Sequence, residues 1–186
     1  SIADFHGPDQ LIDESKDHKH RWPHSLNLEI RNPLSIQQSY TKLLPGARHL
    51  HYCMEAAMAW RREKGYETGK HLKHDELPQS IHIKTYAEAA KYCGLVKPNN
   101  RIQAQFSLQY ATCMTLLTGE TSGKIFSHDN LSLSSVTHLL DRTQLSSVDS
   151  PPGRWAEITI IERSGQTSTT TRRNLKGDPG NPLSQH

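Results

Sequence analysis

Apolar side chains recur at helical spacing in two long stretches of the chain. Over Arg48–Lys64 they share one helix face, as i, i+4, i+7 and i+8: Leu50, Met54, Ala57 and Met58. Gly65 is a natural end for this helix. A second helix is predicted over Gln103–Thr118, where Gly119 follows the last apolar residue.

Strict alternation of apolar and polar side chains predicts two half-buried strands. Over Ser80–Tyr86, Ile81 and Ile83 point to one face, and His82 and Lys84 point to the other. Arg154–Glu162 places its inward side chains in the same way: Ala156, Ile158 and Ile160. Residues 163–166 form a hairpin turn, and the Thr-rich segment Thr167–Arg173 is the return strand.

Shorter patterns complete the predicted order of elements. Leu34–Tyr40 has the composition of a strand, and Ala87–Tyr92 adds a helical turn. Asp129 or Asn130 is expected to cap a third helix that carries three apolar residues: Val136, Leu139 and Leu140. Strands and helices mixed in this order predict an α+β fold, with a mostly antiparallel sheet and helices packed on one face.

Composition excludes several classes of protein. The 186 residues carry a formal charge of only +3, and acidic and basic residues are interspersed, so neither nucleic acid nor a membrane is an expected partner. The three cysteines stand far apart, which argues against a disulfide framework and favours a reducing, cytoplasmic compartment. No apolar run approaches the roughly 20 residues of a membrane span.

The chain divides into three predicted regions. Residues 1–33 are polar and irregular, residues 34–176 form the α+β domain, and residues 177–186 form a C-terminal tail. Both ends have the character of cut ends, because structured sequence starts at Ser1 without Met. A fragment of a longer protein is therefore expected.

One loop has the chemistry of an anion site. Lys42 precedes a helix start, where free backbone N–H groups favour negative charge. Arg48 can hold a carboxylate through two parallel hydrogen bonds. His51 titrates near neutral pH, so it can move a proton or bind a carboxylate. A surface lysine, a structural ion pair and a histidine that ties helix to loop remain the alternatives for these three residues.

Histidine spacing raises the question of a metal. His18, His20 and His24 form one group, and His71, His74 and Asp75 form another. Neither group has a cysteine or a second matching pair. We therefore expect adventitious binding of nickel or zinc and no resident metal.

Three segments in register resemble the C-terminal half of the MmgE/PrpD family. They are KLLPGARHLH at 42–51, AQFSLQYA at 104–111 followed by LLTG at 116–119, and GDPGNPLS at 177–184. They are similar to the family's Lys-x-x-Pro-x-x-Arg-x-x-His run, its AQFSLPYAVA…LLDG helix and its GDPxNPLS segment. The chain departs from the usual pattern at Ala47 and Gln109, which leaves the subfamily open.

The resemblance implies a fold and an activity. Members include 2-methylcitrate dehydratase, cis-aconitate decarboxylase and iminodisuccinate epimerase, which use no metal or organic cofactor. They pair a large helical domain with a smaller α+β lid, and the active site lies between the two. The chain is then a substrate-capping lid, most similar to that of a 2-methylcitrate dehydratase. Its partners are a small polycarboxylate, the N-terminal helical domain of the same enzyme and a second copy in a homodimer.

The resemblance also assigns roles to residues. Lys42 matches an active-site lysine of the lid, and with His51 it is the predicted catalytic pair. Arg48, His49 and Tyr86 are predicted to bind substrate, although Tyr92 is an equal match to the lid tyrosine of the decarboxylases. A stand-alone, non-catalytic interaction domain and an inactive fragment derived from the same lid remain alternatives. Nothing in the sequence selects dehydration over decarboxylation or epimerisation.

Overall fold

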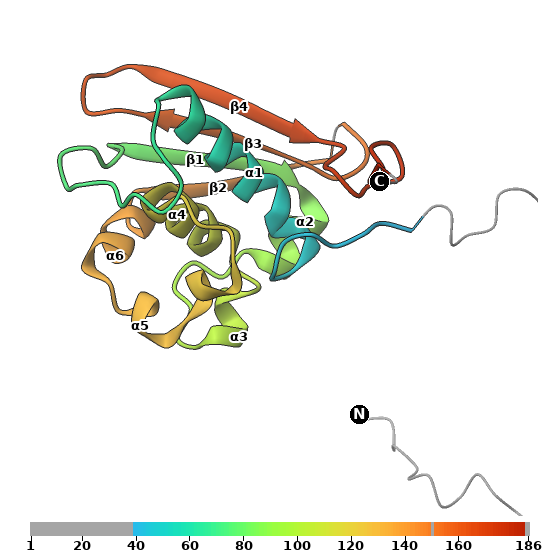
Figure 1. The fold of residues 1–186 in the computed structure, drawn as a ribbon, viewed down its shortest axis with the longest axis horizontal. Helices are drawn as coiled ribbons and strands as arrows, with labels where there is room; N and C mark the ends of the chain where they lie inside the picture. The colour runs from blue at the N-terminus through green and yellow to red at the C-terminus, as the bar shows by residue number, and fades with distance from the viewer. Residues whose placement is uncertain (1–38, 150, 185–186) are drawn as a thin grey trace, which may run out of the picture. The chain divides into compact units, whose positions relative to one another are not determined.

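Four strands form one sheet in the order β2-β1-β3-β4 (Figure 1). This computed structural model describes residues 39–149 and 151–184, which belong to one unit, Ser35–His186. The strands are β1 (Ser80–Tyr86), β2 (Thr143–Val148), β3 (Trp155–Ile161) and β4 (Thr167–Arg173). The predicted strands at 80–86, 154–162 and 167–173 are therefore confirmed.

Helices cover one face of the sheet. The strand residues that point to them are buried, and the core includes Ile81, Ile83, Ala156, Ile158 and Ile160. The longest helix, α1 (Arg48–Glu63), packs on β3 and β4, and its neighbour α4 (Leu108–Thr118) packs on α1 (Figure 1). Side chains on the opposite face, among them His82 and Lys84, are exposed. The predicted α+β layering is confirmed.

The remaining helices are short. They are α2 (Ala87–Cys93), α3 (Arg101–Ala104), the 3-10 helix η3 (Gly123–Phe126), α5 (His128–Leu131) and α6 (Ser134–Leu140). All of the elements between α2 and α6 lie in the crossover from β1 to β2. Within the described ranges, no helix has both the length and the apolar character needed to cross a membrane.

The prediction of a mostly antiparallel sheet was wrong. The sheet is mixed, because β1 pairs in parallel with β2, from Ile81 opposite Thr143 to Tyr86 opposite Val148. The other two pairs, β1 with β3 and β3 with β4, are antiparallel. The sequence pattern gave no signal for β2, since Leu145 is its only large apolar side chain before Val148.

Two predicted helices differ in detail. The helix expected over Gln103–Thr118 is interrupted, because the Ser107 hydroxyl accepts a hydrogen bond from the Tyr110 N–H and starts α4 there. The expected caps of the third helix were wrong, since Asp129 and Asn130 lie inside α5. The apolar residues assigned to that helix are buried in α6, as expected: Val136, Leu139 and Leu140. Of the predicted strand 34–40, residues 34–38 lie outside the described residues, as does the N-terminal segment 1–33, and Ser39 and Tyr40 are not in a strand.

A buried arginine joins α1 to the end of α4. Arg61 is 1 % exposed, and its guanidinium donates to the carbonyls of Leu116, Glu67 and Lys70 at 2.6–2.8 Å. Gly119 ends α4 with φ +67°, and a Cβ there would lie 2.8 Å from Arg61 Nε. Glycine is therefore required at this place both by backbone conformation and by the close approach of the guanidinium.

Candidate active site

An ion pair at the start of α1 joins the first and third sequence motifs. The Arg48 guanidinium binds the Asp178 carboxylate, and the two side chains are only 5 % and 11 % exposed. Tyr52, one turn along α1, donates its hydroxyl proton to Asp178 Oδ2 at 3.3 Å. The rings of Tyr40 and Tyr52 lie 4.9 and 5.4 Å from Arg48 Cζ, within the range of cation–π attraction.

A tight turn delivers Asp178 to this position. The Thr41 N–H donates to the Gly177 carbonyl at 2.8 Å, and the Gly177 N–H donates to the Asn181 carbonyl at 2.8 Å. Gly177 has φ +91°, and a Cβ on it would lie 2.5 Å from the Thr41 carbonyl oxygen. The C-terminal segment is thus fixed beside the Lys42 loop, and any larger residue at 177 would push the two apart.

His51 belongs to the same buried cluster. Its side chain has no exposed surface, and Arg48 Nη1 donates to its Nδ1 over 2.9 Å. Burial lowers the pKa of His51 to about 4, and the nearby charges of Arg48 and Lys42 act in the same direction. His51 is therefore a neutral acceptor at neutral pH and holds the Arg48 side chain from behind.

His49 points away from His51, as the spacing of two residues along a helix requires. Its Nδ1 shares a hydrogen bond with the hydroxyl of Tyr86, and the two rings lie 5.6 Å apart. Burial lowers the pKa of His49 and raises that of Tyr86. Both groups are consequently uncharged at neutral pH, and they form a proton-carrying pair between α1 and the end of β1.

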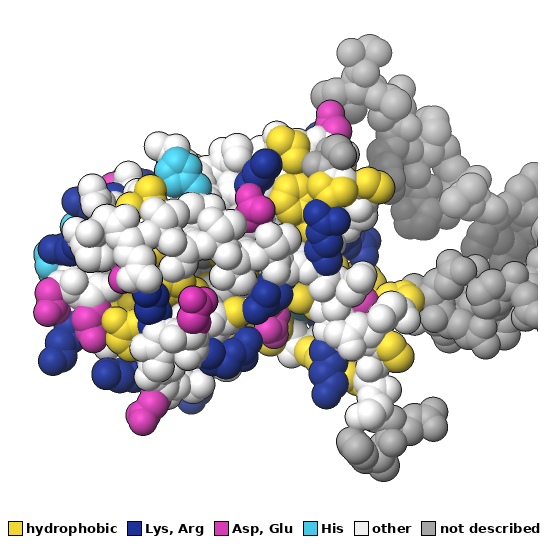
Figure 2. All heavy atoms as spheres, turned by 90° about the horizontal axis from the view of Figure 1, so that it is seen from above, with side chains coloured by type: hydrophobic (Ala, Val, Ile, Leu, Met, Phe, Trp, Pro, Cys, Tyr) yellow, Lys and Arg dark blue, Asp and Glu magenta, His cyan; other side chains and the backbone are white. Residues whose placement is uncertain are grey.

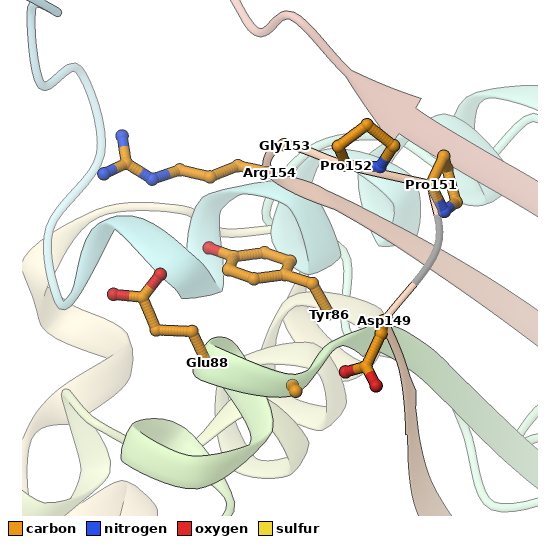
Figure 3. Close-up of a pocket in the computed structure, with 8 residues that line it drawn as sticks. Tyr86, Glu88, Asp149, Pro151, Pro152, Gly153 and Arg154 are labelled. Carbon is orange, nitrogen blue, oxygen red and sulfur yellow. The ribbon is translucent and has the colours of Figure 1, made fainter.

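A hollow of about 560 Å³ opens beside Tyr86. The sequence analysis did not single out the charged residues on its wall, which are Glu88, Asp149 and Arg154. In Figure 3 the Arg154 guanidinium, the Tyr86 hydroxyl and the Glu88 carboxylate point to the same side, whereas Asp149 points away from them. Arg154 Cζ also lies 5.4 Å from the Tyr40 ring. The sequence marked Arg154 only as the first residue of the predicted strand 154–162. In the structure it directly precedes β3.

Lys42 is exposed in the loop before α1. Its charge helps to lower the pKa of His51, after burial and the charge of Arg48. Among the described residues, no carboxylate forms a salt bridge with Lys42.

The five predicted site residues therefore fall into three settings. Arg48 and His51 are sealed in one cluster, His49 bonds to Tyr86 on the wall of the hollow, and Lys42 is exposed in the loop before α1.

The other candidates of the sequence analysis have ordinary surroundings. Tyr92 is 59 % exposed on α2 and lies outside the wall of the hollow. His71 and His74 are exposed, and in the part of the chain that the structure covers no three metal-binding side chains come together. The group at His18, His20 and His24 lies outside the described residues.

Comparison with known families agrees with the resemblance of the three motifs. The family model of the MmgE/PrpD C-terminal domain matches residues 45–186. This range is most of the chain and includes both partners of the buried ion pair. No curated protein gives a significant match.

Proposed function

The chain belongs to the MmgE/PrpD family, and from this premise we propose that it is the substrate-capping lid of a cofactor-independent lyase or isomerase of small polycarboxylates. The reaction we favour is the dehydration catalysed by 2-methylcitrate dehydratase. The observation that carries the proposal is the hydrogen-bonded His49–Tyr86 pair beside a hollow that Tyr86 and Arg154 line, with the exposed Lys42 in the loop that precedes the same helix.

We assign substrate recognition to Lys42 and Arg154, because neither forms a salt bridge with a carboxylate of the described residues. Lys42 lies in the loop before α1, and Arg154 Cζ lies 5.4 Å from the Tyr40 ring near that loop, so a molecule with two carboxylates is the expected ligand. Arg48 is a poorer candidate, since Asp178 already compensates its charge. We assign Arg48 and His51 to positioning: they fix the helix start from which His49 reaches the Tyr86 hydroxyl.

Proton transfer falls to the hydrogen-bonded pair of His49 and Tyr86. Dehydration removes a proton from the carbon next to a carboxylate and expels hydroxide from the neighbouring carbon, which leaves as water once it is protonated. Tyr86 keeps its proton because burial raises its pKa, so its hydroxyl suits hydrogen bonding to the departing oxygen better than it suits the role of base. His49 can resupply that proton, and the base comes from the helical half.

This chain presents an apolar surface that the helical half of the enzyme could bind. Exposed apolar side chains surround the segment from α2 to α4: Tyr92, Leu95, Val96, Ile102 and Phe106. The Ala47 N–H donates to the Gln105 carbonyl at 2.8 Å, which ties this surface to the Lys42 loop. A contact through this α2–α4 surface would give the hollow a second wall. Figure 2 shows another face of the molecule, with hydrophobic and basic side chains side by side at its right-hand end, where Figure 1 places the C-terminal segment.

A cytoplasmic location is part of the same proposal. Cys53, Cys93 and Cys113 are buried free thiols in the structure, which suits a reducing compartment. Burial raises the pKa of Cys53 and of Cys113 to about 12, so neither is a reactive thiolate.

The test is an assay of the complete enzyme. The chain is fused to or co-expressed with the helical half, and the release of water from 2-methylcitrate is followed beside cis-aconitate decarboxylation and iminodisuccinate epimerisation. Lys42→Ala and Tyr86→Phe should each lower kcat/KM by about 100-fold or more, a usual range for such groups. Lys73→Ala, at another exposed lysine, is the matched control. Full activity in both site variants would contradict the proposed roles.

The exposed apolar surface also favours a second candidate, a stand-alone interaction domain. In that case the purified chain would bind a protein partner through Ile102 and Phe106, and the fused enzyme would show no activity toward any of the three substrates. Ile102→Ser with Phe106→Ser, tested for both binding and activity, separates the two functions. Loss of activity that follows loss of binding to the helical half supports the lid.

A further inference from the structure

Four basic side chains meet at the opposite end of the sheet. His74 precedes β1, Arg142 precedes β2, Arg163 follows β3, and His138 lies on α6. They line a hollow of about 450 Å³ together with Pro78 and Gln79. The hollow at Tyr86 lies at the other ends of the same strands, a full strand length of roughly 20 Å away.

The hydrogen bonds among these side chains fix which atoms carry protons. Arg142 Nη1 donates to His138 Nδ1 at 2.9 Å, and Arg163 Nη2 donates to His74 Nδ1 at 3.3 Å. A guanidinium can only donate, so both Nδ1 atoms are acceptors. The proton of each neutral ring is then on Nε2, and the two rings lie 5.2 Å apart. The polar ends of all four side chains are thus donors, a set that suits an anion and disfavours a cation.

No carboxylate of the described chain lines this hollow. Among the described residues, neither Arg142 nor Arg163 forms a salt bridge. The adjacent carboxylate of Asp141 is bound to Lys97 at 2.7 Å, and that of Glu162 is bound to Lys64 at 2.6 Å. Burial lowers the pKa of His138, the nearby Arg142, His74 and Arg163 act in the same direction, and Asp141 opposes them. A bound anion would relieve this repulsion.

We propose that this cluster is a binding site for a small oxyanion, the phosphoryl or carboxylate group of a metabolite, separate from the lid's substrate site. Two guanidinium groups on different elements can hold one such group from two sides. The histidine Nε2–H groups supply further donors. Since Arg142 adjoins β2 and Arg163 adjoins β3, the ligand would join the two strands that flank β1. The proposal does not depend on the reaction that the lid serves.

The experiment uses the chain as it is, titrated with sodium phosphate and with citrate at low ionic strength and followed by the imidazole resonances of His74 and His138. Saturable shifts of these resonances are expected. Arg142→Gln combined with Arg163→Gln should weaken binding by about 10-fold or more, whereas Arg101→Gln, an exposed arginine on α3, should leave it unchanged. Tighter binding of phosphate would identify a phosphoryl ligand, and tighter binding of citrate a carboxylate. Linear, non-saturating shifts, or equal weakening in the Arg101→Gln control, would overturn the proposal.

Discussion

Removing Asp178 tests whether the Arg48 ion pair organises the start of α1. Asp178→Ala leaves a guanidinium whose side chain is 5 % exposed with no carboxylate beside it. Breaking a buried pair from one side costs about 3–5 kcal/mol, and the bonds of Arg48 to His51 and to two tyrosine rings place the expected loss near the lower limit, about 3 kcal/mol. That is a large share of the free energy of unfolding of a typical domain.

A double-mutant cycle isolates the pair. Arg48→Met removes the charge but keeps much of the side-chain volume, and in that background Asp178→Ala should cost about 1 kcal/mol or less. A coupling free energy of about 2 kcal/mol is therefore expected. Urea unfolding at 25 °C and pH 7, followed by circular dichroism, measures all four proteins.

A second ion pair in the chain is the matched control. Lys64 and Glu162 lie 2.6 Å apart, but their side chains are 20 % and 26 % exposed. Glu162→Ala should consequently cost about 1 kcal/mol or less. If Asp178→Ala costs no more than Glu162→Ala, or if the Arg48 and Asp178 effects simply add, the buried pair does not organise this region.

Two further predictions concern the same cluster. Gly177→Ala should destabilise the chain by about 2 kcal/mol or more, because the residue has φ +91° and its new Cβ would lie 2.5 Å from the Thr41 carbonyl oxygen. The control is Gly165→Ala, at φ +85° with open space around it. In the same urea assay this control measures the cost of the backbone conformation alone. Acid should destabilise the chain through His51, whose pKa is about 4 when folded and 6.5 when unfolded, so the unfolded state binds the extra proton and stability falls as pH drops through this window. Between pH 7.5 and pH 5 the loss is about 2 kcal/mol, and His51→Gln should abolish that part of the pH dependence. A variant that is as acid-sensitive as the native chain would show that His51 is not buried in its neutral form.

The strands differed in how far the sequence could predict them. Strand β1 was predicted with its observed ends, since Ile81 and Ile83 alternate with His82 and Lys84. Strand β2 was missed because Thr143–Val148 has no such alternation. It is an edge strand that gains its hydrogen bonds from β1 after a crossover of more than fifty residues. Local pattern cannot report a pairing that depends on so distant a neighbour.

The sequence predicted which residues belong to the site, but not which residues they bind. Lys42, Arg48, His49, His51 and Tyr86 were all proposed from the resemblance. Arg48, His49 and His51 lie on the first turn of α1, Tyr86 bonds to His49, and Lys42 lies in the loop before the helix. The sequence left open a structural ion pair at Arg48. It could not identify the partner, because Asp178 lies 130 residues away. Asp178 belongs to the third motif, and the turn at Gly177 brings its carboxylate to Arg48.

The distribution of compensated and uncompensated cations separates structural from ligand-binding groups in this fold. Arg48 and Arg61 are buried, and the chain itself supplies a carboxylate to the first and three carbonyls to the second. A buried cation without such partners would be too costly to keep, so these two arginines are accounted for by folding alone. Isolated surface cations need no explanation either, because water solvates them. Arg142 and Arg163 differ from both kinds: they converge on one hollow, each donates to one of two histidine rings that lie 5.2 Å apart, and neither forms a salt bridge within the described chain. Folding gives no reason for that convergence, whereas a bound anion does.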